Sequence, residues 1–249
     1  MGFWGRLQAS LKQQSPLHIA SNKRASVAAV FRHSSDAKLQ LLFIRRCVNP
    51  RDTWSGQIAF PGGRTQAHET DIDSARRETM EEIGLNLHDP SIQVLGQVSD
   101  RPVHYGTTVV STFVFYTPST EFTPQLEPSE VQDALWVDVD YLLHAPIKAL
   151  KIPVIMIFPW LKSYPSLHKL LQSHSYLSHF HFPCIYLPRP NTSITSEQDT
   201  RRKSNDFVLW GLTYTMMSDL LVSGGHSPLP LASPSLRFVR HVLFHLRSH

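Results

Sequence analysis

The chain contains 249 residues, of which 41% are apolar and 18% charged, so it is long enough to form a globular domain with a sizeable core. The formal net charge of +4 is mild, and the sequence lacks the basic, aromatic-interleaved stripe that is typical of nucleic-acid-binding proteins. Two cysteines exclude a disulfide framework and favour a reducing intracellular setting, and the longest apolar stretch, residues 152–161, is too short to span a bilayer.

Residues 1–24 predict an N-terminal helical extension. Four apolar residues recur there at helical spacing: Phe3, Trp4, Leu7 and Leu11. The stretch contains no acidic residue, which is typical of mitochondrial targeting segments, but a helix that packs on the domain has the same pattern. Both interpretations stay open.

Residues 25–145 predict the core domain, in which strands alternate with turns. Short apolar runs that are rich in β-branched and aromatic residues and bounded by turn residues predict strands. These runs cover residues 25–31, 39–44, 92–98, 107–116 and 134–139. A short helix is expected near residues 140–145.

A further short strand is expected at residues 57–60, and it ends at a glycine turn. Pro61, Gly62 and Gly63 would break the strand, because glycine permits the positive φ angles that a tight turn needs. Backbone N–H groups in such a turn suit phosphate oxygens. We therefore expect a strand, a glycine turn and a loop that leads into a helix.

The helix that follows combines a narrow apolar stripe with a cluster of carboxylates. The stripe consists of Ile72, Ala75, Thr79 and Ile83. Glu78, Glu81 and Glu82 lie on a different face, where their like charges repel. A hard divalent cation such as Mg²⁺ would reverse that repulsion. The alternative is a solvated charged face on which Arg77 pairs with Glu81.

Residues 63–85 resemble the Nudix box, whose pattern is G-x5-E-x7-R-E-U-x-E-E-x-G-U, with U an apolar residue. The matching residues are Gly63, Glu69, Arg77, Glu78, Glu81, Glu82, Gly84 and Leu85. The single departure is Thr79, which stands where the family usually has an aliphatic residue. The resemblance implies an α/β fold, a Nudix-type α/β/α sandwich with a mixed sheet and a catalytic loop-helix, with helical extensions at both ends.

A longer stretch, residues 41–64, resembles the coenzyme A pyrophosphatase branch of this family. The residues that fit are Leu41, Leu42, Arg45, Gly56, Phe60, Pro61, Gly62 and Gly63. Arg46 stands where the branch prefers serine or alanine, and Arg51 lies one residue out of register. Residues 182–187 and 209–221 are similar to the C-terminal strand and the final helix of the branch.

The branch resemblance implies metal-dependent hydrolysis of the diphosphate linkage of CoA or acyl-CoA, which yields 3′,5′-ADP and 4′-phosphopantetheine or its acyl form. One alternative is hydrolysis of another nucleoside diphosphate derivative, such as ADP-ribose, a dinucleotide or an oxidised nucleotide. The other is a non-catalytic protein that binds a nucleotide or CoA. In each case the partner is a small molecule, and the sequence leaves a homodimer open.

The resemblance also implies which residues form the site. The ligands of a Mg²⁺ or Mn²⁺ ion would be Glu78, Glu82, Glu81 and Glu69. Arg77 would orient one of these glutamates through a charge-assisted hydrogen bond. The general base would be Glu130, in a loop before a strand, or a glutamate of the box itself, such as Glu81. For Glu130 an ordinary solvated side chain is the alternative.

The remaining contacts implied by the resemblance are to phosphate. The backbone of Gly62 and Gly63 would lie against the metal and the phosphate groups. The 3′-phosphate of CoA would be gripped by one of three arginines, because a guanidinium suits bidentate contact with phosphate. These are Arg45, Arg46 and Arg51, and the sequence does not distinguish among them.

Residues 146–249 predict a C-terminal extension that packs on the core, with a helix at residues 166–174 and a polar loop at residues 188–206. Four histidines raise the question of a zinc site: His168, His174, His179 and His181. Their irregular spacing favours ordinary packing or surface histidines. The predicted compartment is the cytosol or the mitochondrion, because the C-terminus does not match the peroxisomal Ser-Lys-Leu signal.

Overall fold

The computed structural model describes residues 2–49, 54–103, 108–157, 159–173, 178–188 and 207–231. Within them, the central sheet contains β1 (Lys23–His33), β2 (Leu39–Arg46), β3 (Ile58–Ala59), β4 (Gly62–Arg64), β5 (Gln93–Pro102), β6 (Thr108–Tyr116) and β7 (Val131–Asp138). The helices beside this sheet are α1 (Phe3–Gln13), α2 (Asp71–Ile83), α3 (Val139–His144) and α6 (Gly211–Ser223). The remaining elements are β8 (Lys148–Pro153), α4 (Val154–Ile157), the 3-10 helix η1 (Pro159–Ser163), α5 (Pro165–Ser173), β9 (His179–Tyr186) and β10 (Val208–Leu209).

The central sheet is mixed. Its strand order is β3-β2-β1-β6-β5, with β4 paired to β1 and β7 paired to β2. β1 and β6 run parallel, whereas the other pairs described in this sheet are antiparallel. β1 is long enough to pair with β4 near its start, where Val27 faces Gly62, and with β2 near its end, where Phe31 faces Leu41. β6 pairs with β1 along most of its length, so β4 and β2 lie one after the other on the opposite side of β1.

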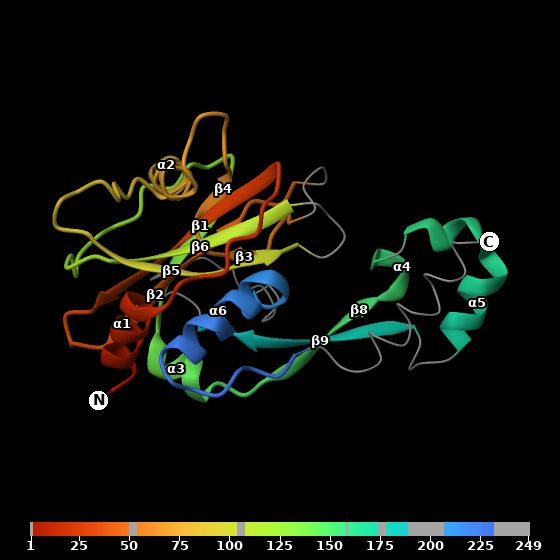
Figure 1. The fold of residues 1–249 in the computed structure, drawn as a ribbon. Coiled ribbons are helices and arrows are strands. Elements are labelled where there is room, and N and C mark those ends of the chain that lie inside the picture. Colours follow the sequence, from red (N-terminus) through yellow and green to blue (C-terminus); the bar gives the residue numbers. More distant parts are fainter. Residues whose placement is uncertain are drawn as a thin grey trace, which may run out of the picture.

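Helices cover both faces of the sheet (Figure 1). On the face under α2, the buried residues include Ala28, Val30, Leu42, Ile44, Ala75 and Ile83. On the opposite face, under α1 and α6, they include Leu7, Leu11, Phe31, Phe43, Tyr214 and Leu220. Neighbouring residues of β1 and β2 alternate between the two clusters, because successive side chains of a strand point to opposite faces. The fold is the predicted α/β/α sandwich with a mixed sheet.

The elements of the core largely follow the sequence predictions. β1, β2, β5, β6 and β7 lie at the five predicted strands, and α3 lies at the predicted short helix. The prediction of a glycine turn is wrong in one respect, because Gly62 and Gly63 belong to strand β4. Gly62 has a φ of +149°, and a Cβ atom there would lie 2.6 Å from Cα of Val27. Glycine thus allows β4 to pair closely with β1 instead of ending the sheet.

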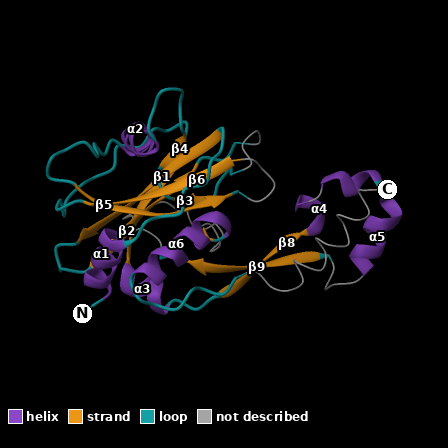
Figure 2. Ribbon diagram, in the orientation of Figure 1, coloured by secondary structure: helices purple, strands orange, loops and turns teal. Residues whose placement is uncertain are grey.

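Five elements within the predicted C-terminal extension form a projecting arm: β8, α4, η1, α5 and β9 (Figure 1). β8 and β9 pair as an antiparallel ribbon, and the short helices follow at its far end (Figure 2). The predicted helix near residue 166 is confirmed as α5. His174, and residues 189–206 of the predicted polar loop, lie outside the described residues. No helix in the described ranges is long and apolar enough to cross a membrane.

Candidate metal centre

α2 is held between two local capping interactions. At its start, the backbone N–H of Asp73 donates to the side chain of Thr70 at 3.2 Å. At its end, Gly84 adopts a left-handed conformation with a φ of 73°, and its N–H donates to the carbonyl of Met80. The predicted apolar stripe faces the sheet, with Ala75 and Ile83 buried. This packing fixes which glutamates of the helix point toward β4.

Glu82 is the buried carboxylate of the site. Its side chain is 1% exposed, and its Oε2 accepts a hydrogen bond of 2.8 Å from the backbone N–H of Gly62. Nη1 of Arg46 lies 3.4 Å from its Oε1. Burial raises the pKa of Glu82 to about 8, against the opposing influence of the Gly62 N–H and the Arg46 charge. A carboxylate in this position binds either a proton or a cation readily near neutral pH.

Glu78 and Glu130 join Glu82 in a compact cluster of three carboxylates. One oxygen from each lies within 4.8 Å of the others, although Glu130 comes from the loop before β7. Burial raises the pKa of Glu78, while its ion pair with Arg77 opposes that rise. Three carboxylates at this separation repel one another, and a hard divalent cation with oxygen ligands would reverse that repulsion. The donor set therefore fits Mg²⁺ or Mn²⁺.

Gly63 provides the space that the cluster occupies. A Cβ atom at Gly63 would lie 2.5 Å from Oε2 and 2.6 Å from Oε1 of Glu78, closer than van der Waals contact allows. The backbone of β4 therefore lies directly against the Glu78 carboxylate. The sequence predicted that Gly62 and Gly63 lie at the site, and the structure places both there.

Arg77 connects the other two glutamates of the predicted site. Its Nε donates to Glu69 at 2.8 Å, and its Nη1 lies 2.8 Å from Glu81 and 2.9 Å from Glu78. The hydrogen bonds from Arg77 hold the pKa of Glu69 below its usual range. Glu69 and Glu81 thus lie in ion pairs with Arg77, outside the three-carboxylate cluster. The Arg77–Glu81 pair of the alternative interpretation is present, and it coexists with the cluster.

The three candidate arginines have different positions. Arg46 lies beside Glu82, as described above. Arg45, its neighbour on β2, points to the opposite face of the sheet, where it stacks 5.5 Å from the ring of Phe207 and lies 3.7 Å from Asp133. Arg51 lies outside the described residues. Among the described arginines of this set, the structure brings Arg46 to the carboxylate cluster.

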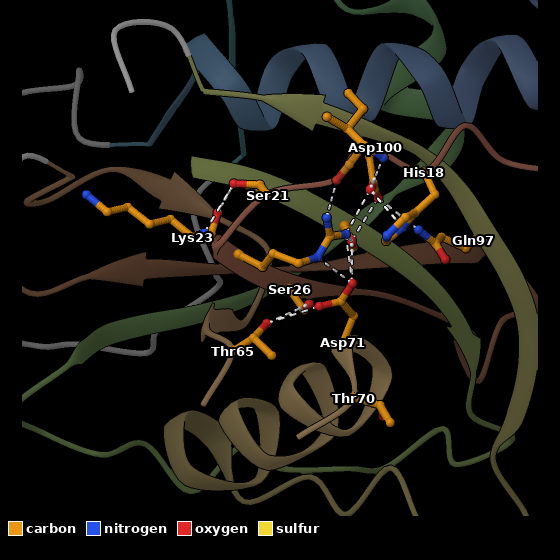
Figure 3. Close-up of polar contacts among 12 residues, drawn as sticks. His18, Ser21, Lys23, Ser26, Thr65, Thr70, Asp71, Gln97 and Asp100 are labelled. Carbon is orange, nitrogen blue, oxygen red and sulfur yellow. Dashed lines mark hydrogen bonds and ion pairs between the residues drawn. The ribbon is translucent and has the colours of Figure 1, made fainter. Parts of the chain in front are cut away.

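A second polar cluster, which the sequence analysis missed, lies at the start of α2. Arg24 of β1 pairs with Asp71, the first residue of α2, at 2.7 Å and with Asp100 of β5 at 2.8 Å. The hydroxyl of Ser111 donates to Asp100 at 2.8 Å, and Figure 3 shows Asp71 and Asp100 converging from the helix and the sheet. Isolated arginine and aspartate residues far apart in the sequence give no pattern from which such a cluster could be predicted.

Asp100 is fully buried in this cluster and nevertheless stays acidic. Burial acts to raise its pKa, but hydrogen bonds from Arg24, the backbone N–H of Ile19 and Ser111 hold the pKa below its usual range. Ile19 belongs to the link between α1 and β1, and its carbonyl also accepts from Arg24. The cluster therefore fastens the first turn of α2 and the preceding link to the sheet.

Comparisons with known proteins agree with the motif. A model of the NUDIX domain family matches residues 22–158. An uncharacterized protein of Schizosaccharomyces pombe is 29% identical over 227 residues, 82% of this chain and 66% of that protein. The peroxisomal coenzyme A diphosphatase NUDT7 of Mus musculus is 28% identical over 131 residues, 52% of each chain. A solved Nudix hydrolase from M. Smegmatis has a TM-score of 0.40 at 21% identity, covering 47% of this chain and 71% of that one.

Proposed function

The chain belongs to the Nudix family, and from this premise we propose that it is a divalent-metal-dependent hydrolase of a nucleoside diphosphate derivative. The proposed substrate is CoA or acyl-CoA, cleaved at the diphosphate linkage to 3′,5′-ADP and 4′-phosphopantetheine or its acyl form. The observation that carries the proposal is the cluster of Glu78, Glu82 and Glu130, whose carboxylate oxygens lie within 4.8 Å of one another. The similarity to the mouse CoA diphosphatase supports the choice of substrate.

In this proposal, Glu78 and Glu82 hold the ion from successive turns of α2, and Glu130 approaches it from the loop before β7. When bound, the ion neutralises the negative charge that develops on the phosphate oxygens during hydrolysis. Without a metal ion, the repulsion among these carboxylates is relieved by protonation of Glu82, whose pKa is about 8. A divalent ion that displaces this proton would neutralise the negative charge of the ionised carboxylates.

The surrounding residues would bind the substrate and move the proton. Glu130 is exposed, so it is accessible to accept a proton from the attacking water. Arg77 would orient Glu78 through their 2.9 Å ion pair. The guanidinium is itself fixed by ion pairs with Glu69 and Glu81. Arg46 lies beside the cluster and would contact a substrate phosphate through its fork of N–H donors.

A second candidate function is hydrolysis of a different nucleoside diphosphate derivative, such as ADP-ribose or a dinucleotide. The observation that favours it is Arg46, which lies 3.4 Å from Glu82 at a position where the CoA branch prefers a small residue. The guanidinium of Arg46 beside the proposed metal ligands would change which phosphate of a substrate binds next to the metal ion. The two candidates share the metal cluster and differ in the substrate group that Arg46 contacts.

The test is product analysis after the purified chain is incubated with Mg²⁺ or Mn²⁺ and, in parallel, CoA, acetyl-CoA, ADP-ribose, NADH and 8-oxo-dGTP. Glu82→Gln serves as the blank, because it removes the charge of a buried ligand and keeps the size of the side chain. Glu121→Gln is the matched control, since it makes the same change at an exposed position outside the cluster.

Release of 3′,5′-ADP from CoA or acetyl-CoA by the wild type and Glu121→Gln, with most activity lost in Glu82→Gln, is the expected result. Cleavage of another substrate with the same dependence on Glu82 would retain the hydrolase and replace CoA by the second candidate. Full activity of Glu82→Gln would overturn the metal-ligand assignment. Binding of CoA without turnover of any substrate would instead indicate a non-catalytic Nudix protein.

A further inference from the structure

The arm formed by β8, α4, η1, α5 and β9 leaves the body of the structure as a narrow ribbon (Figure 1). At its base, Ile185 of β9 belongs to the core cluster under α1 and α6. Farther out, Val154, Leu161 and Phe180 are buried, but they belong to neither core cluster of the sandwich. The tip of the arm, which consists of α4, η1 and α5, therefore contains buried apolar side chains of its own, Val154 and Leu161, outside both core clusters.

The arm carries charge of one sign. No aspartate or glutamate occurs between residues 141 and 196, although the chain contains 20 acidic residues. Four lysines in the arm are exposed: Lys148, Lys151, Lys162 and Lys169. Exposed lysines in a segment without acidic residues attract an anionic partner, and no carboxylate in the segment repels it.

Large apolar side chains are exposed among these lysines. Met156 of α4 is 70% exposed, and Tyr164, between η1 and α5, is 57% exposed. The arm also contains a mainly apolar pocket of about 210 Å³, lined in part by Val154, Ile155 and Leu161. Exposed apolar side chains in a cationic surface are typical of segments that enter the interface between lipid headgroups and acyl chains.

We propose that the tip of the arm docks on an anionic lipid surface. Lys151 and Lys162 would contact the headgroups, while Met156 and Tyr164 would enter the upper acyl region. A phosphate-rich nucleic acid would satisfy the lysines and leave the apolar side chains in water, so a lipid surface matches both properties of the tip. This docking does not involve the carboxylate cluster, because the residues of the cluster belong to α2 and to the loop before β7.

The test measures binding of the full chain to vesicles of phosphatidylcholine with and without phosphatidylserine, by flotation at low and high salt. We expect binding to the anionic vesicles only, and weaker binding at high salt. The double variant Lys151→Glu and Lys162→Glu should lower the partition coefficient at least about tenfold. Met156→Asp should lower it as well, because it places a charge where an apolar side chain enters the interface.

The matched control is Lys12→Glu with Lys23→Glu, which makes the same change of charge at two exposed lysines of the body. Circular dichroism and thermal unfolding confirm that each variant is folded. Equal binding to neutral and anionic vesicles, or an equal loss in the control, would overturn the proposal. A concentration-dependent dimer that the tip variants abolish, with no binding to vesicles, would also overturn it and assign the tip to a second copy of this chain.

Discussion

Glu82 is a carboxyl group whose ionisation is coupled to folding. Burial raises its pKa from an ordinary value of 4.5 to about 8. In the metal-free protein, the folded state therefore retains a proton that the unfolded chain has released between these two pH values. The free energy of unfolding should fall as the pH rises through this window, because the unfolded state binds fewer protons.

Glu82→Gln should remove this pH dependence. The variant has no proton to release at this position, so in EDTA it should gain stability relative to the wild type between pH 5 and pH 9, by a few kcal/mol. Urea unfolding at several pH values measures the difference. Glu121→Gln, at an exposed position, should follow the wild-type profile; parallel profiles for Glu82→Gln and the wild type would contradict the burial of an ionisable Glu82.

Gly63→Ala should displace Glu78 while the fold persists. The new Cβ atom would overlap the Glu78 carboxylate, and the side chain must turn away from the cluster to accommodate it. We expect the affinity for Mn²⁺ to fall about 10- to 100-fold, as is usual when a metal ligand loses its support. Calorimetric titration measures it. Gly2→Ala, where nothing lies within 4 Å of the added atom, is the control and should bind Mn²⁺ normally.

The sequence predicts those residues of the site whose contacts lie within one helix, and it does not predict contacts between distant segments. Glu78 and Glu82 are one helical turn apart, so their convergence follows from the helix itself. Arg45 and Arg46 were indistinguishable in the sequence, and the strand places them on opposite faces of the sheet. The hydrogen bond from Gly62 to Glu82 required the pairing of β4 with β1, which no local pattern encodes.

At the scale of elements, α2 is fastened to the sheet through Arg24. Replacing Arg24 by methionine would leave Asp71 and Asp100 close together without their shared cation. Removing one partner from a buried ion pair typically costs about 3–5 kcal/mol. Arg24→Met should therefore lower the free energy of unfolding at pH 7 by that amount, as measured in urea.

The pH dependence of this loss has a definite sign. Asp100 has a pKa below its usual range when Arg24 is present, so its stabilising contribution exists above the unfolded pKa and disappears as the pH falls through the folded pKa. The gap between Arg24→Met and the wild type should narrow in acid. Arg32→Met is the control on the same strand, where the guanidinium stacks 4.1 Å from the Trp136 ring. A gap that is constant with pH would contradict the role of Asp100.

The sequence predicted no strand at β8, which depends on pairing with a distant segment, whereas β9 overlaps residues 182–187, where the resemblance implied a strand. β8 and β9 contain Pro153 and Pro183, and proline lacks the backbone N–H that a strand donates to its neighbour. A proline is tolerated where a strand has a neighbour on one side only. β9 pairs with β10 at Ile185 and Tyr186, beyond Pro183, so at the proline its described partner is β8. The two strands define a ribbon that becomes visible only in three dimensions.

At the scale of the whole molecule, the first and last described helices pack together. Nε of Arg6 in α1 donates to the carbonyl of Gly224, just after α6, at 2.7 Å. Leu7 of α1 is fully buried in the cluster under both helices. The N-terminal helix thus packs as a structural part of the sandwich, as one of the two interpretations of residues 1–24 expected.

Leu7→Ala should lower the free energy of unfolding by about 2–5 kcal/mol, because it leaves a cavity between α1 and the sheet. Leu17→Ala is the matched control, since Leu17 is 62% exposed and should lose little. Chemical unfolding compares the two variants. Equal, small effects would mean that α1 does not contribute to the stability of the sandwich.

The parallel pairing of β1 with β6 has a consequence for synthesis of the chain. β1 supplies the centre of the sheet, but its register with Thr108–Tyr116 forms only after those residues have left the ribosome. The contacts of α1 with the segment around α6, such as the hydrogen bond from Arg6 to Gly224, form later still, after α6 has been made. Because these contacts are so non-local, the nascent chain carries an apolar strand with an open edge through much of its translation, and its folding should be slow and sensitive to chaperones.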